Sequence, residues 1–384
     1  MRTSTSSPGP FPSLFFWEEF TYAAKRTRDG GQVPAWAERG LRALRDGLGC
    51  EPGNAPAMRH LHRVELTDDA YVNGQLPDAY RAEHGALTLF GLHQTAGAQP
   101  VHRRGVGLGT AVRSLRDGVL STSAAERRLT AAATAHDLDE LVSHVQGLVP
   151  LLRKADVGLD YTRLYRDLAD WLTPAHGRVL RAWGLQYTDP GTTSDGEHTR
   201  QDAVARPYWN TFDADLARTG ADLAALRSGA GREAGTVPAM WPFYRTPLST
   251  ELRNRGALTR SLAAEHAALT VFAVHQQGRT TPVHAEGRTP GHACRLLLDR
   301  SDDADRTSVE RRLGALLTSL DAGELAQHLR GLVPLLRRAA IGLDYEALRH
   351  ALRWWDDPQR PQEQSRIRNR WDRDFRITAP SRPA

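Results

Sequence analysis

The chain has 384 residues and a formal net charge of +5, with 40% hydrophobic side chains and only two cysteines. It is long enough for two domains with separate hydrophobic cores, and no apolar run approaches the roughly eighteen residues of a membrane-spanning helix. Cys50 and Cys294 lack the spacing of a metal site, so we interpret them as reduced thiols of a soluble, cytoplasmic protein.

The first residues, 1–13, contain one arginine and no long apolar core, which favours a disordered leader over a signal peptide. A first folded domain is expected over residues 14–187. Within it, residues 82–94 (AEHGALTLFGLHQ) are apolar nearly all round, a composition typical of a central, buried helix. Residues 105–109 (GVGLG) are expected to form a loop ahead of a helix.

Two further helices are expected in this domain. The stretch SAAE, which begins at Ser123, has the spacing of a capping box that starts a helix, and TSVE at Thr307 repeats it. Apolar residues recur at helical spacing over residues 138–152. Pro150 is expected to kink or end that helix, because proline removes a backbone donor and clashes with the preceding turn.

Residues 188–205 are rich in Gly, Ser, Thr and acids, a composition typical of a flexible linker. Beyond them the sequence repeats itself: residues 331–345 (GLVPLLRRAAIGLDY) match residues 147–161 (GLVPLLRKADVGLDY) at all but three positions. We therefore expect a second domain over residues 206–378 and a disordered tail over 379–384. No convincing strand periodicity appears, so the predicted fold is all-α, with two homologous helical-bundle domains joined by the linker.

Four histidines recur in both copies, namely His84/His266, His93/His275, His102/His284 and His144/His328. His84 and His93 are nine residues apart on one predicted helix, which places them on opposite faces, so they cannot chelate one ion. We interpret the recurring histidines as core or pairing residues. The sequence contains no Walker loop, GxGxxG fingerprint or nucleophile elbow, and we expect no catalytic residue, cofactor or metal.

The basic residues are almost all arginines, since only Lys25 and Lys154 are lysines. Guanidinium groups can donate two hydrogen bonds to a phosphate. Each ERRL stretch, at Glu126 and Glu310, puts two arginines in the first turn of an expected helix, where cations are unfavourable unless an anion is recruited. The alternative is a local salt bridge to a neighbouring helix.

Other arginines stand in the HRRG and LLRK stretches and their counterparts. The candidate nucleic-acid-binding residues are Arg103, Arg104, Arg113, Arg127, Arg128, Arg153, Lys154, Arg295, Arg311, Arg312, Arg337 and Arg338. The recurring tryptophans, Trp171, Trp183, Trp355 and Trp371, are expected to fill the core rather than stack on bases. Binding of the backbone without sequence readout is the natural expectation.

These stretches in combination resemble a known family. AEHAALTVFAVHQQ, VHRRGVGLG, ERRL, HLRGLVPLLRRAAIGLDY, RWWDDP and GREAGTVPAMWPFY are similar to the CasB small subunit of the type I-E CRISPR Cascade complex. The resemblance covers residues 14–190 and 207–378, nearly the whole chain. It implies that the chain is two belly subunits fused into one polypeptide.

The resemblance also implies an all-helical, non-enzymatic protein that lies beside the guide crRNA, stabilises the R-loop and contacts target or displaced DNA. Its implied partners are the large and backbone subunits of Cascade. The HRRG contact carries over only to Arg103 and Arg104, because the second copy reads HAEG.

Two other classes of function compete with this interpretation. A tandem helical adaptor would use the same arginines across protein interfaces and would bind no nucleic acid. A nuclease or other metal enzyme would need carboxylates that converge on the recurring histidines.

Overall fold

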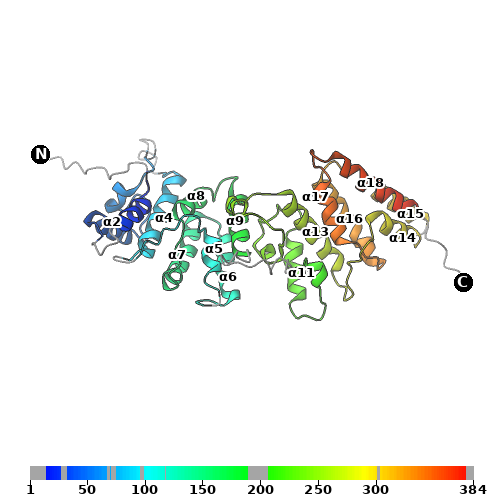
Figure 1. The fold of residues 1–384 in the computed structure, drawn as a ribbon, viewed down its shortest axis with the longest axis horizontal. Coiled ribbons are helices and arrows are strands. Elements are labelled where there is room, and N and C mark those ends of the chain that lie inside the picture. The colour runs from blue at the N-terminus through cyan, green and yellow to red at the C-terminus, as the bar shows by residue number, and fades with distance from the viewer. Residues whose placement is uncertain are drawn as a thin grey trace. The chain divides into compact units, whose positions relative to one another are not determined.

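The computed structural model describes residues 14–26, 33–66, 70, 75–95, 99–116, 118–188, 206–300 and 303–377. Within these ranges the chain is helical, and its only β-type pairings are isolated bridges, which confirms the all-α prediction (Figure 1). The chain divides into two compact units. The predicted leader and tail, and the linker beyond Thr188, lie outside the described residues.

The first unit is built around one buried helix. Its helices are α1 (Phe16–Arg26), α2 (Ala35–Asp46), the 3-10 helix η1 (Pro56–Leu61), α4 (Asp78–His93), α5 (Leu108–Arg113), α6 (Thr122–Ala133), α7 (Leu138–Lys154), α8 (Tyr161–Ala169), α9 (His176–Thr188) and α12 (Thr250–Arg255). Helix α4 packs against α2, α7 and α8. Most of its residues are buried, among them every residue from Ala82 to Gly91, which confirms the prediction of a central helix.

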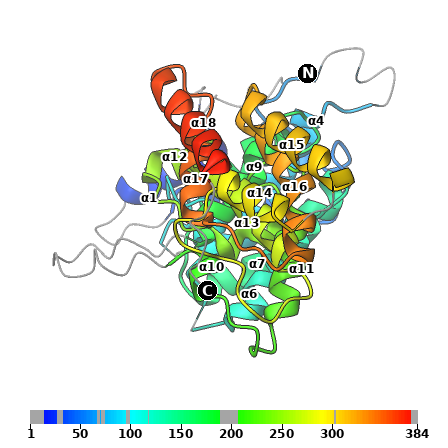
Figure 2. The same cartoon turned by 90° about the vertical axis from the view of Figure 1, so that its right-hand side faces the viewer.

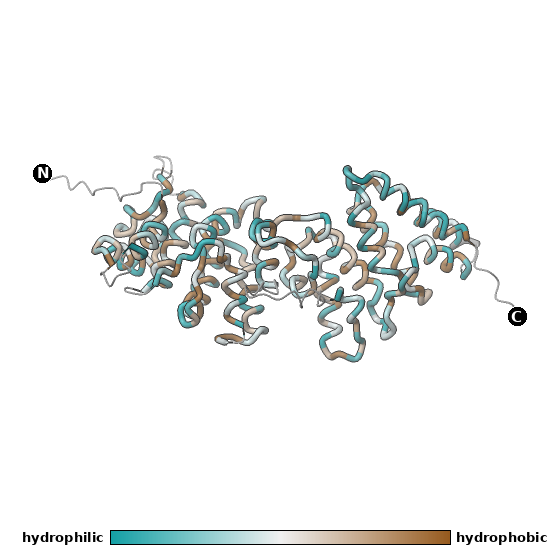
Figure 3. The backbone as a smooth tube through the Cα atoms, viewed as in Figure 1, coloured by the Kyte–Doolittle hydropathy of each residue, from teal (hydrophilic) through white to brown (hydrophobic). Residues whose placement is uncertain are grey.

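The second unit repeats this plan. Its helices are α10 (Tyr208–Thr211), α11 (Thr219–Ser228), the 3-10 helix η2 (Pro238–Phe243), α13 (Arg260–Gln276), α14 (Pro290–Leu298), α15 (Asp303–Thr318), α16 (Ala322–Arg338), α17 (Tyr345–Trp354) and α18 (Pro361–Arg376). Helix α13 takes the place of α4 and packs against α11, α16 and α17 (Figure 2). Helix α18 is hydrophilic along most of its length (Figure 3). Of its residues only Trp371 is buried.

A stacked pair of tryptophans fills the core of each unit. Trp171 and Trp183 lie with ring centroids 5.3 Å apart, and Trp355 and Trp371 repeat this stack at 5.3 Å. All four side chains are buried. Because truncation of such a side chain costs about 3–5 kcal/mol, the tryptophans anchor the bundle, as the sequence predicted.

Two matched glycines let the helix that carries the second tryptophan approach closely. A Cβ atom on Gly109 of α5 would collide with the carbonyl oxygen of Trp183, and one on Gly291 of α14 would collide with that of Trp371. Residues 105–107 of the glycine-rich stretch form a loop ahead of a helix, as predicted, whereas Leu108 and Gly109 already belong to α5. Close backbone packing therefore accounts for glycine at positions 109 and 291 in both copies.

The predicted helix starts at Ser123 and Thr307 are wrong. Helix α6 begins earlier, and the hydroxyl of its N-cap Ser121 accepts a hydrogen bond from the amide of Ala124 at 3.3 Å. Helix α15 begins at Asp303, so Thr307 lies inside it. In both cases a Ser/Thr-x-x-Glu spacing occurs within a helix, where it has no capping role.

Helix α7 also continues through Pro150 to Lys154, so proline does not end it. Its N-terminus is capped by Asp137, whose carboxylate accepts from the amide of Glu140 at 2.8 Å. Leu148, Val149 and Leu152 around the proline are fully buried. This packing offsets the hydrogen bond that the proline cannot donate.

Candidate nucleic-acid interface

The ERRL arginines of the first unit lie on the exposed side of α6. Because α6 begins at Thr122, Arg127 and Arg128 stand in its second turn rather than its first. The free amide groups of the helix start are therefore not beside them, and the expected anion site at a helix N-terminus is not formed. Both side chains are exposed. Arg128 reaches toward α7, where its Nη1 would lie 3.8 Å from a Cβ atom added to Gly147.

The second unit repeats this arrangement in α15. Arg311 is exposed, and Nη1 of Arg312 donates to the carbonyl oxygen of Gly331 on α16 at 3.1 Å. The pair stands well inside α15, which begins at Asp303, so the helix-start argument does not apply here either. A Cβ atom at position 331 would lie 3.3 Å from Nη1 of Arg312, a tight contact, whereas one at position 147 would be in ordinary contact with Arg128.

A third cation extends each arginine pair. Lys154 is seven residues after Gly147, and Arg338 is seven residues after Gly331, so each shares an exposed face of its helix with that glycine. We call Arg127, Arg128 and Lys154 the first basic patch, and Arg311, Arg312 and Arg338 the second basic patch. None of the six side chains forms an ion pair with an acid of the described ranges, which disfavours the local salt bridge.

Arg153 and Arg337 are bonded to the central helices instead. Nη1 of Arg153 donates to the carbonyl oxygen of Leu92 at 3.4 Å, and Nη1 of Arg337 donates to that of Val274 at 3.2 Å. These carbonyls lie in the last turns of α4 and α13, where cations complement the helix dipole. Both residues therefore have a structural task, and they flank the patches rather than complete them.

The HRRG arginines are exposed but face acids. Nη2 of Arg104 lies 3.1 Å from Oε1 of Glu18, with the arginine side chain 75% exposed. Nη2 of Arg103 lies 3.8 Å from Oδ2 of Asp156. The pair of Arg103 with Asp156 is exposed on both sides and contributes little to stability. Glu18 is only 11% exposed, so Arg104 pairs with a largely buried carboxylate.

The remaining two candidates hold helices in place. Nη1 of Arg113 donates to the carbonyl oxygen of Gln186 near the end of α9 at 3.1 Å. Its counterpart Arg295 lies 2.8 Å from Asp299, and only 23% of its side chain is exposed. Arg113 and Arg295 therefore have structural tasks and are not counted in the two basic patches.

The recurring histidines are core and pairing residues, as predicted. Nδ1 of His102 accepts a hydrogen bond from the amide of Tyr161 at 3.1 Å, and His284 receives the same bond from Tyr345 at 3.1 Å. Nε2 of His144 lies 3.5 Å from Glu140 of its own helix. Among the residues that the structure describes, no group of three or more His, Cys, Asp or Glu side chains could hold a metal ion.

In the described part of the chain, no helix has both the length and the apolar character needed to cross a membrane.

Comparison with known proteins identifies the repeated domain. The family model of the CRISPR-associated protein Cse2 matches residues 41–187 and, a second time, residues 222–375. The chain belongs to the Cse2 family. It contains two Cse2 copies in tandem and is a Cascade-type subunit, so the resemblance found in the sequence is confirmed at this level.

Two solved structures are similar to this Cse2 protein. The crystal structure of CasB from Thermobifida fusca has 32% identity, a TM-score of 0.32, and covers 42% of this chain and 88% of its own. The crystal structure of a Cse2-family protein from Thermus thermophilus has 24% identity, a TM-score of 0.32, and covers 45% of this chain and 98% of its own. The comparison with curated proteins found no match.

Proposed function

We propose that this chain is a non-catalytic small subunit of a type I-E Cascade-like surveillance complex, in which one polypeptide replaces two separate small subunits. It acts in the cytoplasm, binds the sugar-phosphate backbone of target or displaced DNA beside the guide crRNA, and stabilises the R-loop. It also braces the large and backbone subunits. The family match in both repeats supports the assembly role.

The observation that carries the binding role is the recurrence of a basic patch on each unit. Arg127 and Arg311 are exposed and have no acidic partner in the described ranges, and Lys154 and Arg338 extend the same surface. Unpaired guanidinium and ammonium groups at matched places can each neutralise a phosphate without reading a base. A folded bundle gains no stability from leaving such cations unpaired, so their recurrence favours an anionic partner.

The test replaces Arg127, Arg128, Arg311 and Arg312 by Ala in the complex recovered with its neighbouring subunits and guide RNA. The affinity for target DNA should fall for all sequences. The slope of log K against log salt should become shallower by as much as about 3, since each phosphate contact contributes roughly 0.7–0.9 to that slope.

The matched control removes four other exposed arginines and hence the same charge. Arg39 and Arg42 lie on α2, and Arg218 and Arg232 flank α11; neither helix carries a residue of the two patches. Their replacement by Ala should leave most of the salt dependence in place. Equal losses in the two variants would show a general charge effect and would contradict the assigned patches.

The competing function is a tandem helical adaptor that binds only protein. The numerous arginines in ion pairs, such as Arg81 with Asp139 at 2.8 Å, show that this chain does use arginine to join helices. An adaptor would leave the DNA affinity of the assembled complex unchanged by the four substitutions, while the retention of this subunit in the complex would fall.

A further inference from the structure

One short segment belongs to the second repeat in sequence and to the first unit in structure. Residues Thr250–Gly256 stand between η2 and α13 along the chain, yet they form part of the first compact unit, where α12 packs on α9. The two repeats therefore do not correspond one to one with the two units. Neither the repeat pattern nor the helix periodicity predicts that this segment lies in the first unit.

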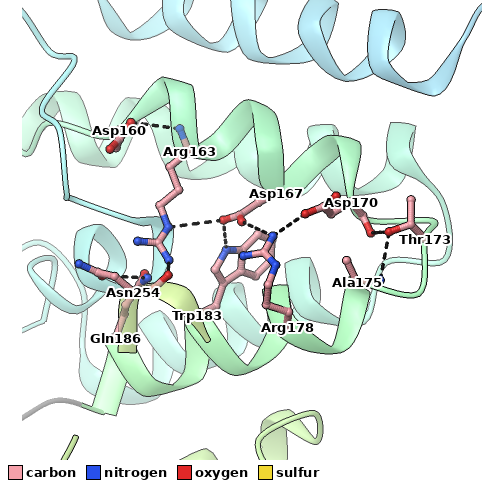
Figure 4. A network of polar contacts seen from close by, with 10 residues as sticks. All are labelled: Asp160, Arg163, Asp167, Asp170, Thr173, Ala175, Arg178, Trp183, Gln186 and Asn254. Carbon is pink, nitrogen blue, oxygen red and sulfur yellow. Dashed lines mark hydrogen bonds and ion pairs between the residues drawn. The ribbon is translucent and has the colours of Figure 1, made fainter. Parts of the chain in front are cut away.

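The segment is held by hydrogen bonds at its C-terminal end. Nε of Arg181, a buried side chain of α9, donates to the carbonyl oxygen of Gly256 at 2.7 Å. Nε2 of Gln186 donates to Oδ1 of Asn254 at 3.3 Å, and Arg163 of α8 donates to the backbone carbonyl of Asn254. Three side chains from two helices thus converge on Asn254 and Gly256, and Figure 4 shows Arg163 and Gln186 beside Asn254.

Gly256 also fits its place by shape. It is buried with a φ of +60°, a conformation that L side chains rarely adopt, and a Cβ atom there would collide with the carbonyl oxygen of Arg178. The segment therefore lies directly against the backbone of α9. A side chain at position 256 would not fit between the two backbones, so the contact requires glycine there.

Behind these contacts lies a charge cluster around the buried Asp167. Asp167 of α8 is 1% exposed, and it accepts a hydrogen bond from Nε1 of Trp183 at 2.9 Å. Arg163 lies 4.0 Å from Asp167, and Arg178 lies 3.6 Å from it and 2.5 Å from Asp170 (Figure 4). Burial raises the pKa of Asp167, whereas the two arginines and Trp183 oppose that shift. The carboxylate holds Arg163 where it reaches Asn254.

The second repeat has different residues at the positions that match these contact residues. Its counterparts of Arg163, Asp167, Arg181 and Gln186 are Ala347, Ala351, Asn369 and Asp374. Two alanines on α17 cannot donate to a carbonyl or hold a guanidinium group. The difference affects the contact residues, while the neighbouring Leu164/Leu348 and Leu168/Leu352 core positions are unchanged.

We propose that Thr250–Gly256 is a docking segment that the second repeat supplies to the first unit. The side chains that bind this segment, Arg163, Arg181 and Gln186, occur in the first repeat alone. The groups that they bind include the backbone carbonyl oxygens of Asn254 and Gly256. This inference does not depend on nucleic-acid binding.

The test is limited tryptic cleavage of the full-length chain after Arg253 and Arg255, which lie within the docking segment. In the wild-type chain the segment is held, so cleavage there should be slow. Gly256→Ala introduces the collision with α9 and should accelerate cleavage at both sites at least about 10-fold. The control Gly278→Ala adds a side chain at a similar φ of +70° with nothing within 4 Å, and should stay within about 2-fold of wild type.

A second variant covers the case in which Gly256→Ala fails to fold. Arg163→Ala installs the residue of the second repeat and removes the donor to Asn254, and it should also accelerate cleavage about 10-fold or more. Arg166→Ala removes an exposed arginine of the same helix and should not. Unchanged cleavage in Arg163→Ala, or equal acceleration in a variant and its control, would overturn the proposal.

Discussion

The hydroxyl of Tyr161 lies 2.9 Å from Nδ1 of His93, and both side chains are buried in the core of the first unit. Tyr345 and His275 repeat this contact in the second unit at 2.8 Å. Burial lowers the pKa of each of these histidines to about 4. Each is therefore neutral in the folded protein at pH 7, where it serves as a hydrogen-bonding part of the core.

The stability of both units should fall as the pH decreases from 6.5 to 4. The unfolded chain binds a proton on each histidine near pH 6.5, whereas the folded chain binds it only near pH 4. The contribution is thus complete above pH 6.5 and is lost below it, by up to about 3 kcal/mol per histidine. Urea titrations at pH 7.5, 6 and 5 measure this loss. His93→Asn and His275→Asn should each flatten it, and an unchanged pH slope in both variants would disprove the assignment.

Gly291→Ala should destabilise the second unit by about 3 kcal/mol or more, because the new Cβ atom meets the backbone of α18, which cannot move like a side chain. Gly314→Ala is its matched control. Gly314 lies within α15 with nothing within 4 Å of an added Cβ atom, so alanine there should stabilise the helix by about 0.5–1 kcal/mol. Thermal unfolding of the two variants checks the opposite signs, and two shifts of the same sign would refute the packing argument.

Ala340→Gly should stabilise the chain. Ala340 follows α16 with a φ of +55°, as its counterpart Asp156 follows α7 with a φ of +52°. A left-handed conformation costs a non-glycine residue about 1–2 kcal/mol, and part of that cost is recovered with glycine, for a net gain of about 0.5–1 kcal/mol. Ala339→Gly, at the preceding right-handed position with a φ of −80°, should instead destabilise. Urea midpoints distinguish the two variants.

Native mass spectrometry of the assembled complex should find one copy of this chain. The proposed fusion of two small subunits requires that number, because the family model is matched twice in one polypeptide. Two copies per complex would supply four Cse2 domains and would contradict the replacement of a subunit pair. Loss of the chain from an otherwise intact complex would favour a different assembly role.

The sequence predicted the features that repeat with a helical period. The buried α4 and the stacked Trp171 and Trp183 follow from apolar spacing, which reports burial directly. The helix starts next to Ser121 and at Asp303 do not follow from the sequence, because a Ser or Thr three residues before a Glu is common inside helices. Boundaries depend on which backbone groups find partners, and short spacings do not determine that.

The candidate site was predicted in part. ERRL pointed to Arg127 and Arg311, and helical spacing explains why Lys154 and Arg338 join them. The contact of Arg163 with Asn254 could not be found this way, since the two residues are 91 positions apart and lie in different repeats. Its only trace in the sequence is that arginine and aspartate stand where the second repeat has alanines.

The alanines at positions 347 and 351 have a consequence for inheritance. Recombination between the two halves of the gene would tend to make the repeats alike again. Copying the second half over the first would replace Arg163 and Asp167 with alanine and would remove the hydrogen bond that Arg163 donates to the backbone of Asn254. Selection for a stably seated segment therefore acts against homogenisation, and the two halves are expected to keep diverging at these positions while their cores stay alike.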